Sequence, residues 1–177
     1  MNVLAYIARG DAIPLPQLSL PSPLPRVSPE AWSRFVRVLC VQDLAEDTPR
    51  GLGAFAVRPR RLGDLGLVRQ TRPTIVSPTR PNSRSTFTGD FVPPLTREIF
   101  LSSPLAQYNA LVQSIVRYTE NLPELPKDFT QSGALGILHS AGPGALRCWD
   151  RGPREGLRGD RPADEVERIF HRANGIF

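Results

Sequence analysis

Residues 139–149 read HSAGPGALRCW, a run of small residues set between an apolar segment and a tryptophan. Gly142 has no β-carbon and therefore allows a tight turn of the backbone. Pro143 suits the first position of a new helix, because the N–H group that proline lacks would have no partner there. The stretch predicts a helix over 132–141, a break at the glycine, and a further helix over 143–149.

Helices are predicted on both sides of this break. Ser28, Pro29 and Glu30 make a helix start, with a capping hydroxyl, a proline in the first turn and an acid near the positive end of the helix dipole. No alternating strand pattern is convincing, so the predicted fold class is mainly α. Apolar residues at helical spacing predict the helices 28–45, 59–66, 97–121 and 162–173.

Two proline-rich segments are not predicted to form regular helices. Residues 1–27 carry five prolines, and proline favours extended chain because it removes a backbone donor and fixes φ. Leucines between these prolines would suit a groove on another protein, which predicts a docking arm that becomes ordered only against a partner. Residues 69–96 are polar and aperiodic, and they predict a long irregular loop within a single domain over 28–177.

Composition limits the function classes. The chain has 177 residues, a formal net charge of +5 and a pI of about 10.0, which suits a polyanionic partner. Its many arginines beside one lysine are also typical of a GC-rich genome. No apolar stretch approaches the roughly 20 residues that cross a bilayer, and the first residues make a poor secretory signal, so we expect a soluble protein. Cys40 and Cys148 fit two buried thiols within helices, and we expect no metal or other cofactor.

The order of these pieces resembles the lysozyme-like domain of the soluble lytic transglycosylases. The sequence GAFAV at 53–57 stands where that family has a Gly-Leu-Met-Gln-Ile turn, and RLGDLG at 61–66 stands where its next helix closes on Leu-Gly. The sequence LHSAGPG at 138–144 fits the family's Ala-Tyr-Asn-Ala-Gly-Pro-Gly segment, which lines a glycan groove. The resemblance covers residues 30–68 and 100–149, and it implies a single lysozyme-like helical domain.

The resemblance also implies a catalytic glutamate at the end of the first core helix. The family's Glu-Ser pair is absent from residues 38–50, so Glu46 is the first candidate for the catalytic acid. Asp43 is the second, because helical spacing places it on the apolar face of that helix. Glycan cleavage needs a protonated carboxyl near the bond, in a partly apolar pocket that raises its pKa. Alternatively, both acids belong to a solvated helix end.

A glycan groove is implied between the glycine-rich turn and the 139–144 segment, where glycine would let the backbone approach a sugar closely. Two departures from the family remove groups that hold the sugar or the catalytic carboxyl. Ala56 replaces the turn glutamine, and His139 with Ser140 replaces the Tyr-Asn pair. His139 could still bind a glycan or serve as a neutral core histidine. The predicted substrate-binding residues are Gly53, Phe55, Gln107, His139, Ser140, Gly142 and Gly144.

These expectations combine into one functional hypothesis. A wall-directed domain without an export signal would reach the wall inside a phage-like particle, so we expect a virion tail component that acts at the host cell wall or periplasm. Its partners would be other particle proteins, through the arm, and peptidoglycan glycan strands, with weak or lost catalysis. An active lytic transglycosylase or muramidase is the alternative. A basic nucleic-acid-binding module is the second alternative, although the chain lacks aromatics interleaved with a basic stripe.

Overall fold

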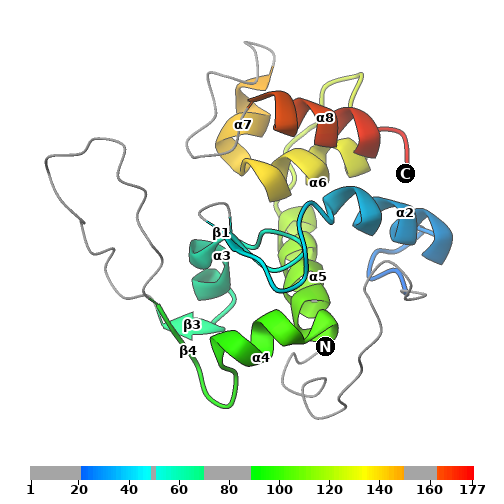
Figure 1. Cartoon of the computed structure of the whole chain (residues 1–177). Helices are drawn as coiled ribbons and strands as arrows, with labels where there is room; N and C mark the ends of the chain where they lie inside the picture. The colour runs from blue at the N-terminus through cyan, green and yellow to red at the C-terminus, as the bar shows by residue number, and fades with distance from the viewer. Residues whose placement is uncertain (1–20, 49–50, 70–88, 150–162) are drawn as a thin grey trace, which may run out of the picture. The chain divides into compact units, whose positions relative to one another are not determined.

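The structure is a computed structural model, and Figure 1 shows its course over the residues that it describes, which are 21–48, 51–69, 89–149 and 163–177. Helices dominate these residues, which confirms the predicted mainly α class. The chain divides into two compact units. The described residues of unit 1 lie within 42–111, and those of unit 2 lie within 21–41 and 112–177.

Unit 2 is built from helices. Within it, α6 and α8 lie side by side, and α2 packs against both of them (Figure 1). Its elements are α2 (Pro29–Leu39), the second half of α5 (Pro104–Glu120), α6 (Gln131–Ser140), α7 (Pro143–Arg147) and α8 (Ala163–Ala173).

Helix α2 starts as the sequence predicts. The hydroxyl of Ser28 accepts a hydrogen bond from the N–H of Ala31 at 3.2 Å, and Pro29 occupies the first turn. The pKa of Glu30 lies below its usual range. The main cause is the hydrogen bond that its carboxylate accepts from its own backbone N–H, and the second is a hydrogen bond from Ser28. The inward face of the helix carries Trp32 and Phe35, both fully buried.

Two glycines on α6 allow the close approach of α8. A β-carbon on Gly133 would lie 2.4 Å from Oδ1 of Asn174, and one on Gly136 would lie 3.2 Å from the β-carbon of Ala173. Ser132, in the first turn of α6, is also buried, and its hydroxyl donates to the carbonyl of Ala173 at 2.7 Å. The N–H of Phe177 donates to the same hydroxyl at 3.2 Å. The last residues of the chain are thus fixed to the start of α6.

Unit 1 combines short helices with two short antiparallel strand pairs among its described residues. Asp47 lies opposite Leu52 in the first pair, and Val68 lies opposite Phe91 in the second. Its elements are β1 (Asp47–Thr48), β2 (Gly51–Leu52), α3 (Pro59–Asp64), β3 (Val68–Arg69), β4 (Asp90–Phe91), α4 (Arg97–Ser102) and the first half of α5. Its fully buried side chains include Leu52, Phe55, Leu62, Leu95, Phe100 and Leu111.

The helix predicted over 28–45 is too long, because α2 ends at Leu39. Cys40 already has an extended conformation, with φ −80° and ψ 92°. Two residues later, the N–H of Gln42 donates to the carbonyl of Ala54 at 3.3 Å. A long-range hydrogen bond therefore replaces the helical one at this point. The spacing of apolar residues along the sequence does not reveal such a bond.

The single helix predicted over 97–121 is two helices, α4 and α5. Pro104 has no N–H to continue a helical ladder, and it disfavours helical backbone in the residue before it. Ser103 is accordingly extended, with φ −106° and ψ 104°. The hydroxyl of Ser103 accepts a hydrogen bond from the N–H of Ala106 at 3.2 Å and so starts the second helix.

The remaining predicted boundaries agree more closely. The helices predicted over 132–141 and 162–173 are confirmed to within one residue at each end. The helices predicted over 59–66 and 143–149 end two residues before the predicted boundary. The prediction of two buried thiols within helices is wrong, because Cys40 and Cys148 are half-buried and follow the ends of α2 and α7.

The segments predicted to be irregular are described only in part. The ends of the 69–96 loop pair with each other through β3 and β4, a contact too short to show a strand period in the sequence. Residues 70–88 lie outside the described residues, as do residues 1–20 of the predicted arm. Leu24, near the end of that arm, is buried.

Candidate functional site

The predicted catalytic acids lie in a short turn after α2, which we call the acidic turn (residues 43–47). The N–H of Glu46 donates to the carbonyl of Asp43 at 3.1 Å, which closes the turn. The carbonyl of Glu46 then accepts a hydrogen bond from the N–H of Gly53 at 2.8 Å. Asp43 is exposed and Glu46 is half-buried. The backbone of Glu46 is therefore fixed, while the residue remains partly exposed.

The partner of the acidic turn is the glycine-rich loop, residues 51–57, which is buried throughout. Leu52 and Val57 exchange two backbone hydrogen bonds, of 3.1 and 3.0 Å, across the base of the loop. Gly51 has φ +149°, and a β-carbon there would lie 2.1 Å from the carbonyl oxygen of Ala56. Ala56 itself has φ +48°, a conformation that costs a non-glycine residue about 1–2 kcal/mol. The surrounding contacts thus hold this loop in a strained shape.

Gln107 of α5 fills the centre of this arrangement. Its side chain is fully buried, and its amide oxygen accepts a hydrogen bond from the N–H of Ala54 at 2.7 Å. Its amide nitrogen donates to the carbonyls of Leu44 and Phe100, both at 2.9 Å. A β-carbon on Gly53 would lie 2.2 Å from the amide oxygen of Gln107. One carboxamide thus joins the acidic turn, the glycine-rich loop and α4.

A second glutamine, Gln42, lies directly before the acidic turn. Its amide nitrogen donates to the carbonyls of Gly51 at 3.1 Å and Gly53 at 2.7 Å. The sequence does not predict this role of Gln42, because nothing in the local pattern distinguishes a glutamine that binds a loop from one that faces water.

Unit 1 brings three of the predicted site residues together, namely Glu46, Gly53 and Gln107. Phe55 belongs to the same loop, but its ring is fully buried, so its role in this structure is in packing. Gln107 is also out of reach of solvent, and its amide is occupied by the backbone groups around it. Among the five predicted site residues of unit 1, the acids at 43 and 46 are those that reach solvent.

Unit 2 holds the other predicted residues, at the junction of α6 and α7. Ser140 is fully buried, and its hydroxyl donates to the carbonyl of Gly136 at 2.7 Å, within its own helix. Gly142 has φ +85°, and its N–H donates to the carbonyl of Leu138 at 3.1 Å, which ends α6. Pro143 then starts α7. His139 and Gly144 are half-buried, and the Ala-Gly-Pro-Gly break is a helix junction.

The carboxylates of the acidic turn differ in their partners. Asp47 forms an ion pair with Arg97, at the start of α4. Within the part of the chain that the structure describes, Asp43 and Glu46 form no ion pair. A group that donates a proton to a glycosidic oxygen must be able to reach the substrate and must carry that proton. Asp47 is also exposed, but its carboxylate is engaged by Arg97, which leaves the exposed Asp43 and the half-buried Glu46 as candidates.

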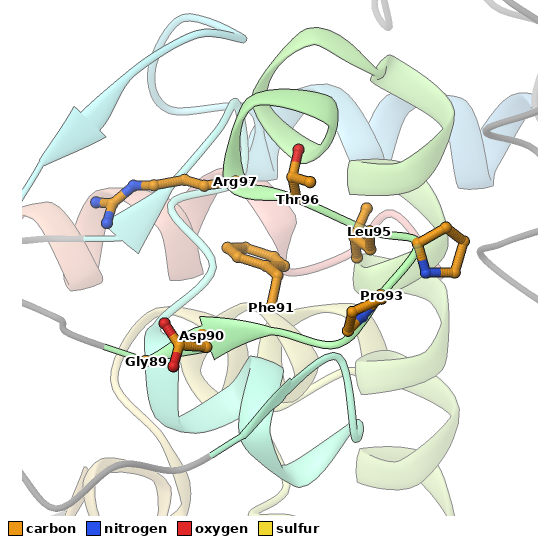
Figure 2. Close-up of a pocket in the computed structure, with 8 residues that line it drawn as sticks. Gly89, Asp90, Phe91, Pro93, Leu95, Thr96 and Arg97 are labelled. Carbon is orange, nitrogen blue, oxygen red and sulfur yellow. The ribbon is translucent and has the colours of Figure 1, made fainter.

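Unit 1 also has an open surface hollow of about 460 Å³ between β4 and α4 (Figure 2). Phe91 lies at its centre in this view, and its ring packs against that of Phe100 at a centroid distance of 5.5 Å. Asp90 and Arg97 lie to one side of it. None of the predicted site residues lines this hollow, although Arg97, which does, forms the ion pair with Asp47 at the end of the acidic turn.

Two further features concern the described residues only. No group of three or more histidine, cysteine or acidic side chains among them is placed to hold a metal ion. In the same residues, no helix combines the length and the apolar character that a membrane span needs.

Comparisons with protein-family models, with curated proteins and with solved structures find no match to this chain.

Replacing Gly53 with alanine is expected to destabilise unit 1 more than replacing Gly66 with alanine. Both glycines have nearly the same φ, +69° and +70°, so both substitutions cost about 1–2 kcal/mol in backbone strain. At Gly66 a β-carbon meets nothing within 4 Å, whereas at Gly53 it collides with Gln107. We expect a further 1–3 kcal/mol of destabilisation at Gly53 from this overpacking. Urea unfolding of both variants measures the difference, and equal midpoints would contradict the contact with Gln107.

Proposed function

We propose that this chain is a tail component of a phage-like particle, with a lysozyme- or lytic-transglycosylase-like fold that contacts the host peptidoglycan. The supporting observation is the hydrogen bond between the carbonyl of Glu46 and the N–H of Gly53, at 2.8 Å. In the family that the sequence resembles, a catalytic glutamate stands beside a glycine-rich turn. Glu46 lies seven residues past the end of α2, whereas the resemblance implies an acid at the end of that helix, so the backbone bond to the loop is the part of the arrangement that supports the proposal.

The proposal includes weak or lost catalysis. Efficient glycan cleavage needs a carboxyl that keeps its proton, and apolar surroundings favour that state. Asp43 is exposed, and Glu46 is only half-buried. The family's turn glutamine is replaced by Ala56, which offers no polar group, and the hydroxyl of Ser140 is occupied within α6. These features favour contact with the wall over its rapid cleavage.

Active cleavage of peptidoglycan, as a lytic transglycosylase or muramidase, is the second candidate function. The observation that favours it is that Glu46, the first candidate acid, is held by its backbone beside the glycine-rich loop and is still partly exposed. The proposed location is the virion or a related injection device, and the proposed substrate is the glycan strand. The arm at 1–27 would bind other particle proteins through its prolines and leucines.

The test is cosedimentation of the purified chain with peptidoglycan sacculi at rising salt concentration. A chain with net charge +5 binds any polyanion at low salt, and such binding is lost as salt screens the charges. Recognition of glycan by a specific binding site should persist as the salt concentration rises. We therefore expect binding to sacculi at 0.3 M salt, where the Debye length is about 5–6 Å. Binding to duplex DNA serves as the comparison.

A variant without residues 1–20 completes this test. It retains Leu24, which is buried, and removes most of the proposed docking arm. We expect it to bind sacculi as the full chain does. Binding to sacculi that disappears with salt in parallel with binding to DNA would overturn the proposal and favour the nucleic-acid alternative.

A further inference from the structure

We infer that Gln107 is a positioning residue, which fixes the acidic turn against the glycine-rich loop and thereby sets the place of the Glu46 carboxylate. This inference rests on the proposed wall-directed function for its biological meaning. The resemblance stated above instead predicts that Gln107 contacts the glycan. Its full burial rules out that contact in this structure, and its hydrogen bonds indicate what it does instead.

The amide of Gln107 bridges segments that are far apart in the chain. Its oxygen holds Ala54, 53 residues earlier, and its nitrogen holds the carbonyl of Leu44, 63 residues earlier. Leu44 lies between the two candidate acids. The carbonyl of Glu46 is bound in turn by Gly53, the neighbour of Ala54. The acidic turn and the glycine-rich loop are therefore each hydrogen-bonded to Gln107 and also to one another.

Glutamine is the residue type that this position needs. A carboxamide provides one acceptor and two donors, and the structure uses the oxygen toward Ala54 and the nitrogen toward Leu44 and Phe100. Leucine would fill the space but leave these three backbone groups without their buried partner. An ionised glutamate would direct oxygen atoms at two carbonyl oxygens. Substitutions at Gln107 should therefore loosen the turn in a way that depends on hydrogen bonding rather than on volume.

The first experiment is native-state amide hydrogen exchange of the full chain and of its Gln107→Leu variant. The informative amide is that of Gly53, because its acceptor, the carbonyl of Glu46, is still present in the variant. We expect its exchange to be about 10- to 100-fold faster, as the acidic turn separates from the loop more often. Amides of α8, in unit 2, should keep their exchange rates. Gln113→Leu, the same change on the same helix, is the matched control.

A Gln107→Glu variant separates hydrogen bonding from packing. When it is protonated, the introduced carboxyl has one donor and one acceptor and partly reproduces the amide. Burial favours that neutral form by raising the pKa of a carboxyl. We therefore expect slow exchange of Gly53 near about pH 5 and faster exchange, after correction for the intrinsic pH dependence, near about pH 8. Because ionisation of any buried carboxyl is costly, hydrogen bonding is judged at about pH 5, where the neutral carboxyl should slow the exchange of Gly53 relative to Gln107→Leu and a role in packing alone would not.

The second experiment links positioning to the wall through a double-mutant cycle of Gln107→Leu and Glu46→Gln, read as affinity for sacculi. If Gln107 acts through Glu46, its loss should have little further effect once Glu46→Gln is present. If the full chain fails to bind sacculi, the proposed function is wrong, while the exchange rates still decide whether Gln107 positions the turn.

Unchanged exchange of Gly53 in Gln107→Leu, or an equal acceleration in α8, would overturn the positioning role. Should Gln107→Leu fail to fold, Gln107→Glu takes its place. Exchange of Gly53 that is as fast at about pH 5 as at about pH 8, after the same correction, would then overturn the inference.

Discussion

Replacing Glu46 with glutamine is expected to lower any release of soluble fragments from purified peptidoglycan by roughly 10²–10⁴-fold, which is the usual contribution of a general acid. Glutamine keeps the shape of the side chain and leaves the backbone bond between Glu46 and Gly53 in place, so the loop should stay folded. What the variant loses is the proton that a carboxylic acid gives to the leaving oxygen. The measurement is the rate of fragment release per mole of protein, compared with that of the full chain.

Asp43→Asn is the matched comparison, since it removes the other candidate carboxylate of the acidic turn, while Asp47 is engaged by Arg97. Asp43 is exposed and Glu46 is half-buried, so we expect the smaller loss at Asp43. Equal release by the full chain and both variants would show that neither carboxylate is the acid. If none of them releases fragments while all bind sacculi, the protein contacts the wall without cleaving it.

The starts of the helices could be predicted from the sequence, because local chemistry determines them. Ser28 and Thr130 cap α2 and α6 with their own hydroxyls, and Pro143 sits at the first position of α7. The end of α2 could not be predicted in this way. Its apolar pattern continues past Leu39, and the chain leaves the helix where the side chain of Gln42 becomes bound to a loop nine to eleven residues away. Such a partner carries no local signal.

In the candidate site too, some features could be predicted from the sequence and others could not. The glycine-rich loop could be predicted from the sequence, since Gly51 and Gly53 are the residues that a left-handed or crowded backbone requires. The acids beside it were visible as residue types. The roles of Gln42 and Gln107 could not be predicted, because the sequence does not distinguish a glutamine with a buried amide from one whose amide faces water. Hydrogen bonds that span 53 and 63 residues depend on the completed fold.

A large loss of stability is expected in unit 2 when Phe35 is replaced with alanine, about 3–5 kcal/mol in the free energy of unfolding. Phe35 is fully buried on the inner face of α2, and its ring lies edge-on to that of Phe177 at a centroid distance of 5.2 Å. Phe177 is held in turn by the hydroxyl of Ser132. Truncation at Phe35 leaves a cavity between α2 and the last residue of the chain, and the rigid clamp on that residue limits how far the cavity can collapse.

Phe35→Leu is the control for this expectation, because it keeps most of the buried volume and should cost less than Phe35→Ala. Urea unfolding followed by tryptophan fluorescence is the suitable measurement. Both tryptophans of the chain, Trp32 and Trp149, belong to unit 2, so the signal reports on that unit. A shift of the midpoint at constant slope would assign the loss to packing in the folded state. Equal midpoints for the two variants would mean that the site collapses around alanine, and that the contact with Phe177 contributes little to holding α2 in place.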